Sequence, residues 1–285
     1  TDEWTASEIA RLPQGTFSAE GFRDDDGVSD EPIRLNASIT IADGTMTLDV
    51  TGSSAQRKSP INCTRHAALC ILAIVAKHLL SERIPINEGF LNRLRVVGPE
   101  GLCCTATKPT PVVGGWELGQ RLVEVIWLAL HPAMPERVPA AGKGLIFHIG
   151  LGGFDPFKDE YFCYMETIAG GNGARPNSDG PDAVQTHVHN TENAPVEEVE
   201  LNYPFMIDRY ELIDGSGGDG EFRGGLGIRR DYYFPHTPVA FTILSDGKKF
   251  APWGLRGGLP GRPARYVYDP NGEGRELPSK TTFDV

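Results

Sequence analysis

The stretch IRLNASITIADGTMTLDV, residues 33–50, carries the clearest structural pattern in the chain. Apolar and polar residues alternate from Ile33 to Ile41, which places every second side chain on one face of a strand. Residues 46–50 repeat this alternation. The Asp-Gly pair at 43–44 separates the two runs, and such a pair is typical of a two-residue β-hairpin turn. The stretch therefore predicts a hairpin.

Three other segments show helical rather than strand periodicity. Residues 62–80 place their apolar side chains on one stripe, and either Asn62 or Thr64 is a suitable N-cap. Residues 116–130 form a second apolar stripe that stops just before a proline. The segment 3–13 suggests a short helix that ends at its last residue, a proline. We expect two main helices and one short one.

Most of the remaining chain is expected to form strands. Residues 144–169 resemble strands joined by glycine-rich turns, and Asn271-Gly272 marks a last hairpin. From residue 196 onward only short strands are expected, in EEVELNY (197–203), RYELI (209–213), LGIRRDYYF (226–234), VAFTILSD (239–246) and ARYVYD (264–269). This order of elements favours an α+β fold that is β-rich, with mixed or antiparallel sheets, over a doubly wound parallel sheet. We expect an α+β part at 1–145 and a β-rich part at 146–285.

Composition limits the possible partners. The 285 residues carry a net charge of −11 and contain no run of five basic residues, which argues against binding to nucleic acid. The longest apolar stretch, 67–80, is shorter than the ~20 residues of a membrane span and contains Lys77 and His78. No signal peptide is visible, and the five cysteines lack zinc spacing. We expect a cytoplasmic protein with reduced thiols, bound neither to nucleic acid nor to a membrane.

Two glycine-rich motifs suggest binding sites but have simpler explanations. GSGGDG at 215–220 matches the dinucleotide fingerprint, yet the glycines that follow it at 224–227 oppose the helix that this fingerprint needs. Tight turns between strands are the better interpretation, and an anion-binding backbone nest is an alternative. GGNG at 170–173 suits either a turn or close backbone approach to a ligand. No P-loop and no nucleophile elbow occur in the sequence.

The stretch DGPDAVQTHVHNTENAPVEEVE, residues 179–200, combines histidines with carboxylates and amides. His187 and His189 would share one face of a strand, and imidazole is a common metal ligand. Two histidines at this spacing are weak support for a metal site. The alternative is that they hydrogen-bond the loop together with Asn190 and Asn193. Similarly, the carboxylate in Asn87-Glu88-Gly89 either faces a pocket or is solvated.

Six stretches together resemble the hydantoinase B family, which includes components of N-methylhydantoinase, 5-oxoprolinase, and acetone or acetophenone carboxylases. They occur in the family's order and span nearly the whole chain. The stretches are LPQGTFSAEGFRDDDG (12–27), LDVTGSSAQ (48–56), PINEGFLNRLRVVGPEG (85–101), PERVPAAGKG (135–144), GGNGARPNSDGPDAVQTHVHNTENAPVEEVE (170–200) and DGSGGDGEFRGGLGI (214–228).

The resemblance implies ATP-dependent chemistry shared between components. A hydantoinase A-type partner would bind ATP and Mg²⁺ and phosphorylate a carbonyl or enol oxygen of a small-molecule substrate. The complete enzyme would also use a divalent metal. The family's metal ligands lie in its N-terminal half, in a His/Asp segment ending in Asp-Ile-Gly-Gly that is absent here, whereas these stretches match the C-terminal half. We therefore expect no metal ligands in this chain, which forms one compact portion of a larger subunit and is catalytically incomplete alone.

The resemblance also changes the expected role of the 179–200 loop. Its polar side chains are expected to form an interlocked network that braces a catalytic cavity, which Asn87-Glu88-Gly89 also faces. The leading function is ATP-dependent hydrolysis of a cyclic amide such as a hydantoin or 5-oxoproline, followed by ATP-dependent carboxylation of a ketone. A non-catalytic assembly module and a standalone metallohydrolase that uses its two histidines are further alternatives. The loop residues expected in the network are Asp179, Asp182, His187, Asn190 and Asn193.

Overall fold

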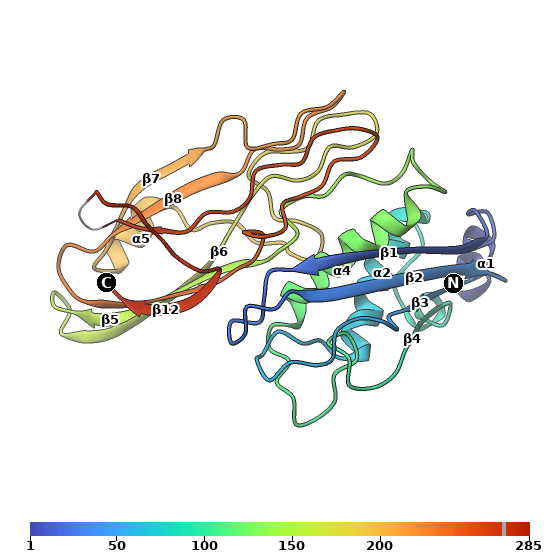
Figure 1. Ribbon diagram of the computed structural model, residues 1–285, viewed down its shortest axis with the longest axis horizontal. Helices are drawn as coiled ribbons and strands as arrows, with labels where there is room; N and C mark the ends of the chain where they lie inside the picture. Colours follow the sequence, from blue (N-terminus) through green and yellow to red (C-terminus); the bar gives the residue numbers. More distant parts are fainter. Residues whose placement is uncertain (270–271) are drawn as a thin grey trace. The chain divides into compact units, whose positions relative to one another are not determined.

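The computed structural model describes residues 1–269 and 272–285, which form two compact units (Figure 1). The first unit spans Thr1–Pro139 and the second spans Ala140–Val285. Each contains its own sheet and its own buried apolar residues. The combination of several sheets with five helices confirms the expected α+β fold.

The first unit is built on a four-stranded mixed sheet. Its strands are β1 (Gly15–Arg23), β2 (Ile33–Ala42), β3 (Thr45–Asp49) and β4 (Leu94–Val97), in that order across the sheet. The β2–β3 hairpin is confirmed: Ala42 pairs with Thr45, and both turn residues have positive φ, 50° at Asp43 and 66° at Gly44. β4 runs parallel to β3, which makes the sheet mixed. The alternate residues of β2 from Ile33 to Ile41 are fully buried, as the sequence predicted.

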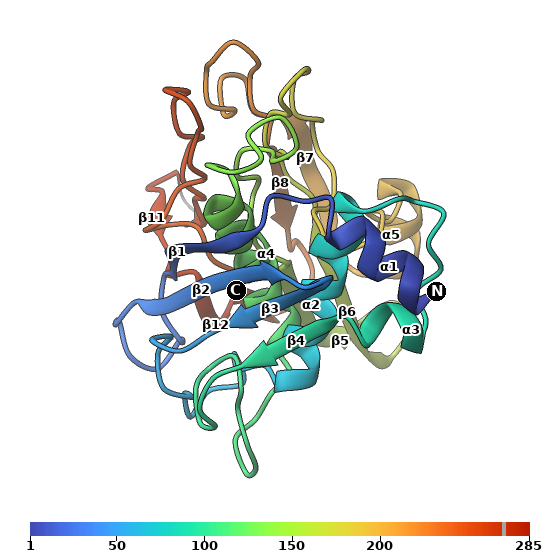
Figure 2. The ribbon, with the colours of Figure 1, turned by 90° about the vertical axis from the view of Figure 1, so that its right-hand side faces the viewer.

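Helices α2 (Arg65–Leu79) and α4 (Gly115–Leu130) confirm the two main predicted helices. Thr64 is the N-cap of α2 and accepts a hydrogen bond from the Ala67 amide at 3.2 Å. Both helices lie on the same side of the sheet (Figure 2). The packing is close, since a Cβ added to Gly21 of β1 would lie 2.5 Å from Val125 of α4. Two short helices, α1 (Asp2–Ile9) and α3 (Glu88–Leu91), complete the unit, and α1 ends four residues before the expected proline.

The second unit contains a four-stranded antiparallel sheet and two smaller ribbons. The large sheet has the order β12-β9-β5-β6, while β7 pairs with β8 and β10 pairs with β11. The strand bounds are β5 (Phe147–Asp155), β6 (Glu160–Ile168), β7 (Met206–Leu212), β8 (Ile228–Tyr233), β9 (Val239–Leu244), β10 (Val267–Tyr268), β11 (Arg275–Glu276) and β12 (Lys280–Asp284). Most of the strands expected here are confirmed, although 264–269 contributes only β10. In the expected last hairpin, Asn271 lies outside the described residues.

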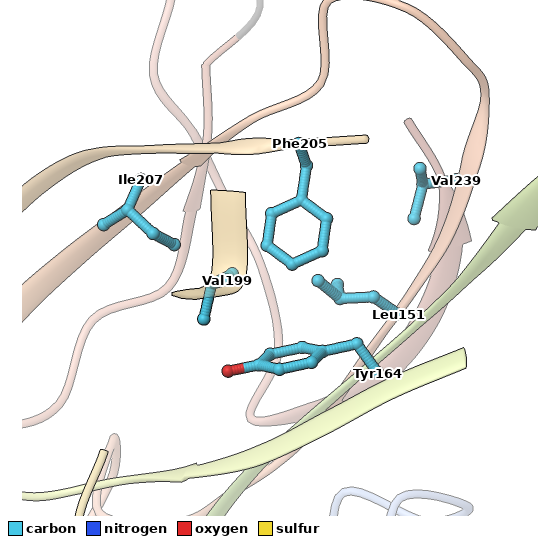
Figure 3. Packing of buried hydrophobic residues seen from close by; sticks show 6 residues of the cluster. All are labelled: Leu151, Tyr164, Val199, Phe205, Ile207 and Val239. Atoms are coloured by element: carbon cyan, nitrogen blue, oxygen red, sulfur yellow. The ribbon is translucent and has the colours of Figure 1, made fainter. Parts of the chain in front are cut away.

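The expectation of a strand at 197–203 is wrong, because these residues belong to helix α5 (Val196–Asn202). Pro195 precedes the helix as its N-cap, and Glu197 and Glu198 lie in its first turn, where a helix dipole favours negative charge. Val199 is the buried residue of this helix. It packs with five other buried residues in an aromatic-rich core, namely Leu151, Tyr164, Phe205, Ile207 and Val239 (Figure 3).

Candidate functional site

Three backbone segments of the second unit lie unusually close together. We call residues 170–173, 179–184 and 223–226 the glycine layer. Its hydrogen bonds include Asn172 N–H to the Pro181 carbonyl at 3.1 Å, Gly225 N–H to the Asn172 carbonyl at 2.8 Å, and Gly180 N–H to the Arg223 carbonyl at 2.8 Å. A Cβ on Gly225 would lie 2.0 Å from the Pro181 carbonyl oxygen. The layer therefore excludes side chains at its contact points.

The two glycine motifs find their explanation in this packing. In GGNG, a Cβ on Gly171 would lie 1.9 Å from the Gly225 carbonyl oxygen, so the motif approaches other backbone of the same chain. In GSGGDG, a Cβ on Gly217 would lie 2.0 Å from the Gly224 carbonyl oxygen. Residues 213–227, all of which are described, contain no helix between β7 and β8. The dinucleotide interpretation therefore lacks the helix that it requires.

Asp182 and Asp179 both bind Arg223 at the edge of this layer. Arg223 donates from Nη1 and Nη2 to the two carboxylate oxygens of Asp182, at 2.8 and 3.1 Å, a bidentate arrangement. The Leu226 amide donates to the same carboxylate at 2.7 Å. The Arg223 amide donates to Asp179 at 2.9 Å. The hydrogen bonds from Arg223, followed by the one from Leu226, lower the pKa of Asp182. Asp179 and Asp182 thus share one positively charged partner.

Asn193 belongs to a second cluster, centred on Glu166 of β6. The Asn193 amide group donates to Oε2 of Glu166 at 3.1 Å and to the Thr167 carbonyl at 2.8 Å. The Tyr232 hydroxyl donates to Oε1 of Glu166. Tyr210 donates in turn to the side-chain oxygen of Asn193 at 3.1 Å. Burial, and then the charge of Glu166, raise the pKa of Tyr232, so its hydroxyl remains protonated and acts as a donor.

The two histidines lie on the segment between these clusters. His187 has a φ of 36°, a left-handed conformation that few non-glycine residues adopt. The His189 ring makes an edge contact with the ring of His148, with centroids 6.5 Å apart, and its amide binds the Thr186 carbonyl at 3.1 Å. Asn190 is exposed. The structure thus places Asp179 and Asp182 with Arg223 and places Asn193 with Glu166. The role of the loop residues in a catalytic cavity stays a prediction.

Lys143 anchors the start of the histidine segment and was not expected from the sequence. Its Nζ donates to the Ile168 carbonyl and to Oε1 of Gln185, each at 2.6 Å. Burial lowers the pKa of Lys143 to about 7. A neutral amine has two N–H groups, enough for both acceptors, and a lone pair that is left over. Lys143 is therefore equipped to accept a proton near neutral pH.

Asn87 and Glu88 belong to the first unit and have local structural roles there. Asn87 is the N-cap of α3, since its side chain accepts from the Phe90 amide at 3.3 Å. Its amide group donates to the Thr1 hydroxyl at 3.1 Å. Glu88 follows in the first helical turn and is exposed. That these residues face the same cavity as the 179–200 loop stays a prediction.

The described residues offer no obvious metal centre. Within 1–269 and 272–285, no group of three or more His, Cys, Asp or Glu side chains is placed to hold a metal ion. In the same described ranges, no helix has both the length and the apolar character needed to cross a membrane.

Comparison with known proteins settles the family. The pattern that defines the hydantoinase B/oxoprolinase family matches residues 1–285.

The chain belongs to the hydantoinase B/oxoprolinase family.

It is 32% identical over 264 residues to a protein named as the B-type component of a D-/L-hydantoinase of Pseudomonas sp. (strain NS671), with 89% of this chain and 44% of the relative covered. Its fold is similar to that of the ATP-dependent caprolactamase from Pseudomonas jessenii, with a TM-score of 0.82, 23% identity, and 100% of this chain and 51% of that chain covered. It is also similar to acetone carboxylase, with a TM-score of 0.80, 21% identity, and 92% and 37% covered. At these identities the two structures show a shared fold. This family member spans less than half the length of the curated relatives it matches first.

Proposed function

We propose that this chain is part of an enzyme that hydrolyses a cyclic amide, such as a hydantoin or 5-oxoproline, at the expense of ATP. The observation that carries this proposal is the family match over all 285 residues. It is supported by the similarity to a hydantoinase component and by the fold shared with an ATP-dependent caprolactamase. All three are named for the same bond class, an amide within a ring.

ATP binding is proposed to reside on a hydantoinase A-type partner. The chain contains no P-loop, and its glycine motifs are occupied by contacts with other backbone. The hydantoinase relative is named as one component of a larger enzyme, which supports the existence of such a partner. Phosphorylation by the partner would turn a poor leaving oxygen into a good one. A cytoplasmic location suits this reaction, because ATP is available there and the five cysteines of the chain are free thiols.

The proposed contribution of this chain is to hold polar groups around the reacting amide. Lys143, with a pKa lowered to about 7, would take up or return a proton during ring opening. Asp182 and Asn193 would fix the loop through Arg223 and Glu166. A divalent metal of the complete enzyme would be held by residues of the family's N-terminal half, as the family resemblance implies.

Carboxylation of a ketone is the second candidate, and the fold shared with acetone carboxylase favours it. The two reactions are separated by their products. The intact protein, its ATP-binding partner and ATP are incubated with hydantoin, 5-oxoproline or caprolactam, and in parallel with acetone and labelled bicarbonate. Ring-opened product that requires both ATP and the partner supports hydrolysis. Label fixed into a ketone carboxylate, without amide turnover, supports carboxylation, and neither product supports an assembly role.

The bracing role of the loop has its own test. His187→Ala is expected to lower ATP-dependent turnover at least tenfold while the complex still assembles, as judged by size-exclusion chromatography. His236→Ala is a matched control, because His236 packs against Phe157 rather than in the loop. If His187→Ala left both turnover and assembly unchanged, the role assigned to His187 would be wrong.

A further inference from the structure

The guanidinium of Arg230 on β8 is buried in the Glu166 cluster. The side chain of Arg230 is 1% exposed and that of Glu166 is 7% exposed. Nε of Arg230 lies 3.1 Å from Oε1 of Glu166, which forms an ion pair. The guanidinium carbon also lies 4.5 Å from the centroid of the Tyr210 ring. Arg230 is therefore fixed in position at one end and along one face.

The other end of this guanidinium is unsatisfied. None of the three guanidinium nitrogens of Arg230 has a hydrogen-bond partner in the part of the chain that the structure describes. The charge of Glu166 lies beside Nε, whereas Nη1 and Nη2 have no carboxylate of the described residues beside them. Glu166 is already engaged, because Tyr232 donates to its Oε1 and Asn193 donates to its Oε2. A guanidinium stays charged at any physiological pH and cannot escape this cost by losing a proton. A buried cation whose two terminal nitrogens lack acceptors requires acceptors from elsewhere.

Neighbouring arginines show what a completed arrangement looks like. Arg229, the preceding residue on β8, is about half exposed and donates from Nε and Nη2 to Asp231. Arg223 donates from both Nη atoms to Asp182. In each case the acceptor is a carboxylate of this chain. Arg230 has a carboxylate on its Nε side only, so its Nη pair is shaped for a second oxyanion.

We propose that Nη1 and Nη2 of Arg230 bind a small oxyanion, a carboxylate or a phosphate group, through two parallel hydrogen bonds. The planar fork of a guanidinium matches the spacing of two oxygens on either group. Tyr210, which covers the guanidinium face, is 46% exposed. The ion pair with Glu166 holds the fork in place before the ligand arrives.

The proposed oxyanion site does not depend on the proposed reaction, although the products of that reaction include such oxyanions. Ring opening of an amide creates a carboxylate, and ATP cleavage releases phosphate. Both are small oxyanions, and a binding measurement distinguishes them without turnover. Failure of the proposed reaction would therefore leave the site intact, and failure of anion binding would leave the reaction intact.

The test is binding of phosphate and of acetate to the intact protein, measured as thermal stabilisation relative to chloride at equal ionic strength. Saturable stabilisation by one of them is expected in the wild type and in Arg229→Lys, and binding at least tenfold weaker is expected in Arg230→Lys. The oxyanion that stabilises more identifies the source, carboxylate or phosphate. Equal stabilisation in Arg230→Lys and wild type, or none in the wild type, would overturn the proposal.

A second measurement uses only the wild-type protein and so does not depend on whether a variant folds. A crystal structure of the wild-type protein grown with the stabilising oxyanion should show that anion on both Nη atoms of Arg230. Ordered water alone at these nitrogens would overturn the proposal.

Discussion

Gly225→Ala tests whether the glycine layer is packed backbone rather than an open binding loop. The added Cβ would lie 2.0 Å from the Pro181 carbonyl oxygen, whereas a carbon and an oxygen in contact lie about 3.3 Å apart. The segments must therefore separate by about 1.3 Å. The atoms that the added Cβ at Gly225 would meet belong to the backbone of Pro181 and Asn172, so no side-chain rotation relieves the clash.

The structure sets the size of the expected effect. Three backbone hydrogen bonds hold Gly225, Asn172 and Gly180 in the layer, at 2.8 to 3.1 Å. Losing them costs about 1 kcal/mol each, and the residual strain adds about 1–3 kcal/mol. We expect the local free energy of opening to fall by at least about 4 kcal/mol, which corresponds to a loss of amide protection of roughly a thousandfold or more.

Hydrogen exchange followed by mass spectrometry on peptides covering 170–184 and 221–227 measures this loss. Gly227→Ala is the matched control, because a Cβ there meets nothing nearer than 3.7 Å. Protection in the control should stay within about threefold of the wild type, a small change typical of Gly-to-Ala at an open position. Protection in Gly225→Ala that stays within tenfold of the control would refute the close packing of the layer.

Three further outcomes are expected. The pKa of Lys143 is about 7 in the folded protein and 10.5 ordinarily. Between pH 7 and 10.5, Lys143 is therefore protonated in the unfolded state and neutral in the folded state. The free energy of unfolding rises with pH across this range, because the unfolded state binds one more proton. Between pH 6 and 9 the rise is about 2–3 kcal/mol, and urea unfolding of Lys143→Met should lack it. A thiol reagent should label the exposed Cys70 and Cys163 in the native protein and the other three cysteines only after unfolding; rapid labelling of more than two would contradict their burial. Arg223 lowers the pKa of Asp182, so the ionised carboxylate stabilises the folded protein and this stabilisation is lost when acid protonates it. Asp182→Asn should already lack this stabilisation at neutral pH, and its stability should therefore fall less on acidification than that of the wild type. An acid-unfolding profile identical to that of the wild type would show that the Asp182–Arg223 pair does not contribute to stability.

The sequence predicted the elements whose pattern is local and long. The β2–β3 hairpin and helices α2 and α4 follow from periodicity over ten or more residues combined with turn or capping residues. Helix α5 has only seven residues, with Val199 its buried residue, too short a segment to display a helical period. β1 was missed although the burial of its residues 16–21 alternates, because two of its three inward residues there, Ala19 and Gly21, are too small to give a clear apolar signal.

The candidate site was predictable in composition but not in geometry. The loop residues Asp182 and Asn193 were expected to act together, but each is held by a distant partner. Arg223 is 41 residues from Asp182 in the chain, and Glu166 is 27 residues from Asn193. Such pairs depend on which strands become neighbours, and no local pattern encodes that. Lys143 was overlooked for a similar reason, since its lowered pKa results from burial that arises only in the folded chain.

ATP-coupled turnover of the intact protein with its partner tests the proposed function most directly. ADP release and ring opening are measured together on a cyclic amide, with and without the partner, and against acetone with labelled bicarbonate. Equal amounts of ADP and ring-opened product, formed only when both proteins are present, are predicted. Bicarbonate fixed into a ketone carboxylate with no ring opening, or ring opening without ATP, would contradict the assignment of this chain to an ATP-dependent cyclic amide hydrolase.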